Sequence, residues 1–309
     1  MRIATIDLGT NTVRLLVSDL DSERAWRSVH ADQRVTRLGE GLAGTGVLGD
    51  APMRRTAAAV ADYARRGRQL GARRIRIVAT SAVREAANRP AFVEMVERAS
   101  GERVHVISGD EEARLTVRGV LRALGPLSGE LLTFDIGGGS TEYTLARGTT
   151  VIATVSLRLG VVPLAERFPF PGTVEPDRYH ALADEVSKQL DAELPSSLAR
   201  ARPDHLVGTA GTVTTLAALD LGLERYDADR VQRHRLERAA VARLRDRLAA
   251  LTVAERAALP CLEPGRADLI IPGVAIVEAT LDRFGMDSLT VSDWGLREGL
   301  VDEMIEALG

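Results

Sequence analysis

The sequence predicts an α/β protein with two related domains, each built on a sheet of short strands covered by helices. Strand patterns alternate with amphipathic helix patterns along most of the chain, which is typical of α/β architecture. A strand, an aspartate, a glycine turn and a second strand occur near residue 7 and again near residue 135. A turn-rich stretch at 124–129 separates the halves, so we place the domains at 1–125 and 126–309.

The second hairpin has the more unusual turn. After an apolar run the chain reads Asp135, Ile136, Gly137, Gly138, Gly139, Ser140, Thr141 and Glu142. Each glycine loses much backbone entropy on folding. Three in a row therefore favour a turn whose bare N–H groups approach a ligand, as phosphate-binding turns do. On this stretch alone, a plain glycine-rich hairpin remains the alternative.

The first hairpin repeats this pattern. Strands are expected at 2–6 and 13–20, and the segment between them reads Asp7, Leu8, Gly9, Thr10, Asn11 and Thr12. In both copies a glycine lies two positions after the aspartate, followed by two turn residues and a hydroxyl. A charged residue, Arg14 or Glu142, lies seven positions after the aspartate. Two such hairpins, far apart in the chain, indicate an internal duplication.

In the first half we expect a loop over 32–50, helices over 52–70 and 90–99, strands over 74–80 and 103–107, and a turn at 81–84. The segment 39–44 matches G-x-G-x-x-G. No strand pattern precedes it and no helix pattern starts at its third glycine, so we interpret it as a surface loop.

Acidic residues follow the strand at 103–107. Ser108 or Asp110 caps a new helix there, and Glu111 and Glu112 lie in its first turn. Carboxylates at this position are favoured by the helix dipole, which is a common structural arrangement. A carboxylate at a strand-to-helix junction also lies at the rim of a domain, where clefts open. The residues alone leave both interpretations open.

The second half continues with a strand at 151–157 and a helix at 176–194. A strand at 206–209 runs into a glycine–threonine turn, 208–212, and a helix at 213–221, which together form an anion site. Further helices are expected at 236–251 and 269–281, and a strand at 289–293. A closing helix at 296–308 is a candidate to pack back on the first domain.

Composition excludes several classes of function. Hydrophobic residues make up 45% and charged residues 27%, with a net charge of −3, so no basic field indicates nucleic acid. Lys188 is the only lysine and Cys261 the only cysteine, which argues against lysine chemistry, disulfides and cysteine metal sites. No histidine has a partner at ligand spacing, so we expect no zinc site. With neither a signal-peptide pattern nor an apolar run of about 20 residues, we expect a cytoplasmic protein without a membrane partner.

Together these pieces predict a phosphoryl-transfer site. Four carboxylates, those of Asp7, Glu112, Asp135 and Glu142, would meet in a cleft between the domains with the amides of the three turns. Carboxylates gathered in one pocket cannot all ionise without cations. Oxygen ligands of this kind suit Mg²⁺, which binds one or two carboxylates together with substrate phosphates. Carboxylates, amides and arginines are the parts that such catalysis uses.

Six motifs carry a resemblance over nearly the whole chain: Asp7–Thr12, Ala79–Arg84, Ser108–Arg114, Asp135–Glu142, Gly208–Thr212 and Ser292–Gly299. In this order they resemble the exopolyphosphatase/guanosine pentaphosphate phosphohydrolase family of the actin, Hsp70 and sugar-kinase superfamily. The resemblance implies two ribonuclease H-like domains facing a central cleft. It also implies Mg²⁺ dependence, with Mn²⁺ as the alternative, a homodimer, and hydrolysis of the terminal phosphate of polyphosphate.

The resemblance also implies roles for individual residues. Glu112 matches the catalytic base, Asp135 and Glu142 match the metal-associated acids, and Arg84, Ser140 and Arg266 match residues that hold phosphates. From the predicted cleft itself we add Asp7 to the acids, and we add the turn residues to the phosphate-binding set, namely Thr10, Asn11, Thr12, Gly137, Gly138, Gly139, Gly211 and Thr212.

Two further functions remain as alternatives. The same chemistry would serve the 5′ end of guanosine pentaphosphate, a (p)ppGpp-type nucleotide. A non-catalytic polyphosphate sensor is the alternative of another class, although a sensor has no reason to keep Glu112, Asp135 and Glu142 together. Longer family members carry a C-terminal helical extension with a His-Asp pair. This chain has no His-Asp dipeptide, so the resemblance does not imply a preference for long polyphosphate.

Overall fold

A computed structural model describes residues 1–21 and 25–307. The chain forms two compact units, the first made of residues 1–119 and 296–309 and the second of residues 120–295. Each unit contains one mixed sheet with helices packed on it, which confirms the α/β fold class. The division into compact units does not show which segments fold by themselves. The domain limits at 125 and 126 therefore stay predictions.

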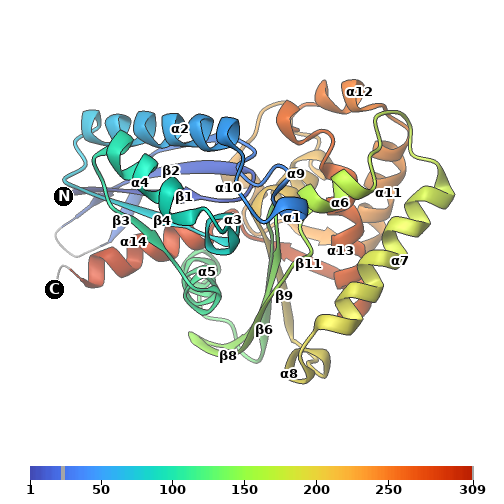
Figure 1. The fold of residues 1–309 in the computed structure, drawn as a ribbon. Helices are drawn as coiled ribbons and strands as arrows, with labels where there is room; N and C mark the ends of the chain where they lie inside the picture. Colours follow the sequence, from blue (N-terminus) through green and yellow to red (C-terminus); the bar gives the residue numbers. More distant parts are fainter. Residues whose placement is uncertain (22–24, 308–309) are drawn as a thin grey trace. The chain divides into compact units, whose positions relative to one another are not determined.

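The sheet of the first unit has five strands in the order β3-β2-β1-β4-β5 (Figure 1). They are β1 (Arg2–Leu8), β2 (Thr12–Leu20), β3 (Trp26–Val35), β4 (Arg74–Ala79) and β5 (Val104–Val106). The first three form an antiparallel meander, and β4 and β5 run parallel to β1. The helices are α1 (Leu42–Thr45), α2 (Asp50–Gln69), α3 (Ser81–Glu85), α4 (Arg89–Ser100), α14 (Leu296–Glu306) and α5 (Gly109–Leu124), which continues into the second unit.

The sheet of the second unit has six strands in the order β10-β11-β9-β6-β7-β8. They are β6 (Leu131–Ile136), β7 (Thr141–Arg147), β8 (Thr150–Leu157), β9 (His205–Thr209), β10 (Arg235–Glu237) and β11 (Ser288–Val291). The helices are α6 (Val161–Arg167), α7 (Pro176–Glu193), α8 (Ser196–Ala199), α9 (Ala210–Asp220), α10 (Ala228–Val231), α11 (Arg238–Ala249), α12 (Val253–Ala257), the 3₁₀ turn η1 (Pro264–Arg266) and α13 (Ile270–Phe284). In the described ranges, no helix combines the length and apolarity that crossing a membrane requires.

The repeated sequence pattern corresponds to a repeated topology. In both units an antiparallel meander of three strands is followed by strands parallel to the first, and β10 is an additional edge strand of the second sheet. The hairpin registers also agree, because Asp7 pairs with Arg14 and Asp135 pairs with Glu142.

The core of the first unit explains why β1 is buried on both faces. Ala4, Ile6 and Leu8 point to one face, where they join a cluster with residues of α2 and α4. The other face is covered by α5 and α14 (Figure 1). Gly299 allows these two helices to touch, since a Cβ at this position would lie 1.9 Å from the carbonyl oxygen of Leu115.

The core of the second unit is organised around α13, whose side chains are buried on nearly all sides. Tyr143 of β7 stacks on Phe134 of β6, with ring centroids 6.2 Å apart. Its hydroxyl forms a 2.7 Å hydrogen bond with the Thr280 hydroxyl of α13. Burial raises the pKa of Tyr143, so the phenol stays neutral. This bond satisfies a polar group inside an otherwise apolar layer.

Several elements differ from the sequence prediction. The strand β3 was not expected because it is an edge strand with polar, exposed side chains, which avoid pairing with other sheets. As a result, the expected loop over 32–50 contains the end of β3 and the short helix α1. The expected turn at 81–84 is the helix α3. Finally, α9 begins at Ala210 rather than at 213, so the glycine–threonine segment forms its first turn.

A fully buried arginine holds three segments of the second unit together. The Arg256 guanidinium donates to the carbonyl oxygens of Leu248 at 2.8 Å, Phe170 at 3.2 Å and Gly172 at 3.3 Å. Burial lowers the pKa of Arg256. Because a buried acceptor without a donor is costly, this residue stabilises the junction of α11, α12 and the segment before α7.

We predict that Arg256→Met destabilises the protein by roughly 2–4 kcal/mol, because it removes the donor from three carbonyl groups. Urea unfolding followed by circular dichroism measures this change. The matched control is Arg247→Met, which removes an exposed arginine of the neighbouring helix and should shift the midpoint little. Equal midpoints for the two variants would contradict the role of Arg256.

Candidate functional site

The hairpin turn of the first unit places a carboxylate beside free backbone amides. Asp7 is the penultimate residue of β1. The turn closes through a 3.0 Å hydrogen bond from the Gly9 N–H to the Thr12 carbonyl oxygen. Within 1–21 and 25–307, no acceptor receives the N–H groups of Thr10 and Asn11. The side chains from Asp7 to Thr12 are nevertheless buried.

The segment after β3 supports this turn. Its Gly39 N–H donates to the Thr10 carbonyl oxygen at 2.9 Å, and the Thr36 N–H donates to the Asn11 carbonyl oxygen at 2.9 Å. A Cβ at Gly39 would lie 2.2 Å from Cγ2 of Thr10, so only glycine allows the approach. The G-x-G-x-x-G match is therefore a packing feature at its first glycine. Gly39 is buried, contrary to the predicted surface loop, whereas Gly41 and Gly44 are exposed.

An arginine and a glutamate meet beyond the ends of β4 and β5. Nη1 of Arg84 donates to Oε2 of Glu112 at 2.9 Å and to the Ile107 carbonyl oxygen at 3.1 Å. The two side chains are 21% and 12% exposed. Nε and Nη2 of Arg84 donate to nothing in the part of the chain that the structure describes. Three of the five guanidinium N–H groups thus remain able to bind a ligand.

The start of α5 fixes the position of Glu112. Oγ of Ser108 accepts the Glu111 N–H at 3.1 Å, so the serine, and not Asp110, caps this helix. The Glu112 N–H donates to the Ser108 carbonyl oxygen at 3.0 Å. A carboxylate in the first helical turn is stabilised in its ionised form by the helix dipole. The neighbouring guanidinium has the same effect.

The hairpin turn of the second unit has the same closure. The Gly137 N–H donates to the Ser140 carbonyl oxygen at 2.9 Å. A Cβ would lie 3.0 Å from this oxygen, as one at Gly9 would lie 3.1 Å from that of Thr12. The N–H groups of Gly138, Gly139 and Ser140 have no acceptor among the described residues. This turn therefore presents consecutive bare amides, as an anion-binding turn does.

The start of α6 forms hydrogen bonds with the carbonyl groups of the glycine turn. Its Val161 and Val162 N–H groups donate to the carbonyl oxygens of Gly137 and Gly138, at 3.2 and 2.8 Å. Gly160 lies so close that its Cβ would be 2.2 Å from the carbonyl carbon of Gly139. The carbonyl groups of the turn are thus used inside the unit. We did not predict α6 from the sequence, since its signal is a single short apolar run.

Both acidic residues of this hairpin are held by hydroxyl groups. Oγ1 of Thr209 donates to Oδ2 of Asp135 at 2.8 Å. Oε1 of Glu142 accepts the hydroxyls of Ser140 and Ser156, each at 2.6 Å. Sequence reasoning missed the roles of Thr209 and Ser156. Only the strand registers, which place Thr209 opposite Asp135 and Ser156 opposite Glu142, identify them.

The guanidinium of Arg266 packs against the backbone of the first turn of α9. A Cβ at Gly211 would lie 1.8 Å from Nη1 of Arg266, so the guanidinium packs directly on this glycine. Thr212 fits against Gly273 of α13 in a similar way, since a Cβ there would be 2.5 Å from Cγ2 of Thr212. The preceding Ala210 has φ of 66°, a conformation that costs free energy in residues other than glycine. Such strain is typical of functional turns.

Comparison with known proteins places this geometry in a family. The model of the Ppx/GppA phosphatase family matches residues 16–308. Exopolyphosphatase 2 of Mycobacterium tuberculosis is 37% identical over 314 aligned positions, which cover 97% of both chains. The chain belongs to the Ppx/GppA phosphatase family. It is therefore a phosphatase, and the predicted family and enzyme class are confirmed.

Solved structures agree with this assignment. The Ppx/GppA family member from Aquifex aeolicus superposes with a TM-score of 0.83 at 32% identity, covering 100% of this chain and 99% of that one. An exopolyphosphatase from Cytophaga hutchinsonii superposes with a TM-score of 0.90 at 27% identity, covering 99% and 98%. The actin-like fold inferred from the sequence motifs is thus confirmed.

In this Ppx/GppA protein the predicted site residues form two groups at equivalent positions. Asp7, Thr10, Asn11, Thr12, Arg84 and Glu112 lie at or beyond the carboxyl ends of β1, β4 and β5 in the first unit. The others, from Asp135 to Arg266, lie at or beyond the carboxyl ends of β6 and β9, or pack on residues there. Ligands of open α/β sheets bind beyond the carboxyl ends of the strands. That both groups line one cleft stays a prediction.

The acidic residues of the second unit fit a magnesium ion. Asp135 and Glu142 face each other in the β6–β7 register, and each accepts hydroxyl donors on one oxygen. Over residues 1–21 and 25–307, no three His, Cys, Asp or Glu side chains form a metal cluster. Mg²⁺ does not need one, because it keeps several waters and binds through one or two carboxylates plus substrate phosphates.

We predict that Gly211→Ala weakens the binding of orthophosphate by roughly tenfold, since the new Cβ displaces the Arg266 guanidinium and a charge-assisted hydrogen bond is worth 1.5–3 kcal/mol. Equilibrium dialysis with radioactive phosphate measures this affinity. Gly172→Ala is the control, because a Cβ there meets nothing within 4 Å. Unchanged affinity in Gly211→Ala would exclude Arg266 from phosphate binding.

Proposed function

We propose that this phosphatase hydrolyses the terminal phosphoanhydride of inorganic polyphosphate and releases orthophosphate. The observation that carries the proposal is the pair of Arg84 and Glu112, 2.9 Å apart, in which three guanidinium N–H groups remain for a phosphate. The names of two relatives support the substrate class, since both the Mycobacterium tuberculosis and the Cytophaga hutchinsonii proteins are exopolyphosphatases.

Glu112 acts as the general base. Its carboxylate accepts a proton from a water molecule whose oxygen forms a bond to the terminal phosphorus. The bond between that phosphorus and the bridging oxygen breaks, and its electron pair remains on the shortened chain. Arg84 binds the oxygens of the terminal phosphate while Nη1 keeps the Glu112 carboxylate in place. A single residue thus orients both the substrate and the base.

The turn amides bind the remaining negative charge. In the first unit these are the N–H groups of Thr10 and Asn11, and in the second unit those of Gly138 to Ser140. None of them donates a hydrogen bond to a described residue. The amides at the start of α9 and the Arg266 guanidinium add further donors for a polyanion. Preorganised donors of this kind stabilise the charge that develops on a transferred phosphoryl group.

Asp135, Glu142 and Asp7 would hold Mg²⁺, with Mn²⁺ as the alternative. When bound, the ion supplies positive charge that offsets the phosphate oxygens. Within this chain, the hydroxyls of Ser140, Ser156 and Thr209 orient the first two carboxylates. Positioning of this kind keeps ligands correctly placed for a metal.

We predict that Glu112→Gln lowers orthophosphate release from polyphosphate by roughly 10²–10⁴-fold, because the amide cannot accept the proton. A phosphate-release assay with Mg²⁺ measures the rate, and calorimetry shows whether polyphosphate still binds. Glu111→Gln, in the same helical turn, is the matched control and should keep near-normal activity. Activity near that of the unaltered protein in Glu112→Gln would refute the assigned base.

The substrate itself is identified by comparing candidate substrates. Polyphosphates of several lengths, guanosine pentaphosphate and ATP are each assayed over a range of concentrations for orthophosphate release. We expect the highest kcat/KM with polyphosphate. A higher value for guanosine pentaphosphate would make the protein a nucleotide 5′-phosphohydrolase. Tight binding of polyphosphate without any hydrolysis would instead indicate a sensor.

A further inference from the structure

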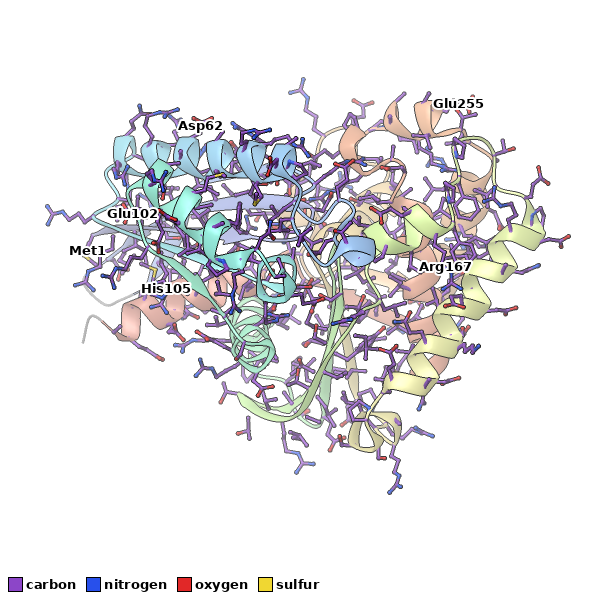
Figure 2. All side chains as sticks on the ribbon, viewed as in Figure 1. Met1, Asp62, Glu102, His105, Arg167 and Glu255 are labelled. Carbon is purple, nitrogen blue, oxygen red and sulfur yellow. The ribbon has the colours of Figure 1, made fainter. Side chains whose placement is uncertain are left out.

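A basic pocket lies in the first unit, at the amino ends of the parallel strands, whereas the candidate site residues of this unit lie at their carboxyl ends. It has a volume of about 570 Å³, within the range of small-molecule sites. Four arginines line it, namely Arg68, Arg73, Arg74 and Arg76, together with Glu102, which is labelled in Figure 2. The lining therefore carries a formal charge of +3, in a chain whose net charge is −3.

The local structure explains why arginines gather there. The chain leaves α2 through Gly71, whose φ is +84°, and the Arg73 N–H donates to the Arg2 carbonyl oxygen as β4 begins. Side chains alternate along a strand, so Arg74 and Arg76 share one face of β4 while Ile75 and Ile77 belong to the core on the other. Successive arginines thus arrive at the amino ends of the parallel strands.

Two of these arginines are compensated by carboxylates. Nη2 of Arg68 donates to Oε1 of Glu102 at 2.6 Å. Arg76 lies 3.5 Å from Glu303 of α14, a carboxylate that Arg114 also approaches to 3.4 Å. The distance from Arg76 exceeds that of a strong charged hydrogen bond. In addition, its buried Nε has no hydrogen-bond partner among the described residues. The positive charge of Arg76 is thus only partly neutralised.

The other two arginines lack an anionic partner. Arg73 and Arg74 are exposed, and no carboxylate of the described residues lies within 4.0 Å of either guanidinium. Guanidinium groups that line one pocket repel one another, and a multivalent anion relieves this repulsion. Guanidinium forks match phosphate oxygens in geometry. Met304, Ala72 and Ala307 add an apolar wall on which an organic group can pack.

We infer that this pocket binds a diphosphate group, either as inorganic pyrophosphate or as part of a nucleoside diphosphate. Arg73 and Arg74 provide the principal contacts, and Arg76 adds a third positive charge. The site is distinct from the candidate active site, because β4 separates the two. The pocket lies where this strand begins, at Arg74, whereas Arg84 follows its end at Ala79. Six residues of strand span roughly 20 Å.

Isothermal titration calorimetry with pyrophosphate at low ionic strength tests the inference. The full chain carries Arg84→Ala, which weakens binding at the candidate active site and so raises the share of the signal that comes from the pocket. Adding Arg73→Ala and Arg74→Ala should weaken pyrophosphate binding at least roughly tenfold, since two charge-assisted contacts are lost. ADP is titrated in parallel. If the two added substitutions weaken the binding of either ligand, the site is supported. If ADP binds more tightly than pyrophosphate, the apolar wall contributes to the affinity.

The matched control removes the same charge elsewhere. Arg66→Ala with Arg103→Ala replaces two exposed arginines of the same unit that do not line the pocket. This control should change the affinity less than about twofold, because screened surface charges contribute little. Equal losses in both double variants, or no binding in the Arg84→Ala background, would overturn the site.

Orthophosphate release separates this inference from the proposed function. In a chain with Arg84 intact, Arg73→Ala with Arg74→Ala should leave hydrolysis of polyphosphate within about twofold of normal at saturating substrate. A collapse of hydrolysis in this variant would mean that the pocket belongs to the catalytic site, which contradicts the inference. Loss of activity in Glu112→Gln has no bearing on it.

Discussion

The structure depends on one tight closure that occurs twice. In each unit, a glycine N–H donates across the hairpin turn to a carbonyl oxygen, from Gly9 to Thr12 and from Gly137 to Ser140. A Cβ on either glycine would lie 3.1 or 3.0 Å from that oxygen, so a side chain would strain the turn. This closure leaves the intervening amides without hydrogen-bond partners among the described residues. It also ends the preceding strand one residue after an aspartate.

Around these turns, helices start at the carboxyl ends of the neighbouring strands. The parallel pairing of β4 with β1, and of β5 with β4, brings α3 and α5 to the carboxyl ends of these strands, where Arg84 meets Glu112. In the second unit, the pairing of β9 with β6 brings Thr209 to Asp135. The chemistry is therefore a consequence of topology, since parallel strands deliver their following residues to the same edge.

The two ends of the parallel strands in the first sheet carry different side chains, because parallel strands begin at one end of the sheet and finish at the other. At the carboxyl ends, helix N-termini and turn amides combine with carboxylates and Arg84. At the amino ends, the arginines of the segment before and within β4 meet with few carboxylates to compensate them. One strand thus connects a candidate catalytic site to a pocket of excess positive charge, and both are suited to phosphate groups.

The sequence alone determined the α/β class, the duplicated hairpins and most helices, because these follow from local periodicity and turn chemistry. It also indicated Glu112 through its motif. The tertiary structure decided what depends on the register and packing of distant residues. The polar edge strand β3, the hydroxyls of Ser156 and Thr209 on the acids, and the support of the first turn by Gly39 have no local signal. Strand pairing and close backbone contacts bring together residues that are far apart in the chain. A short sequence pattern cannot predict such contacts.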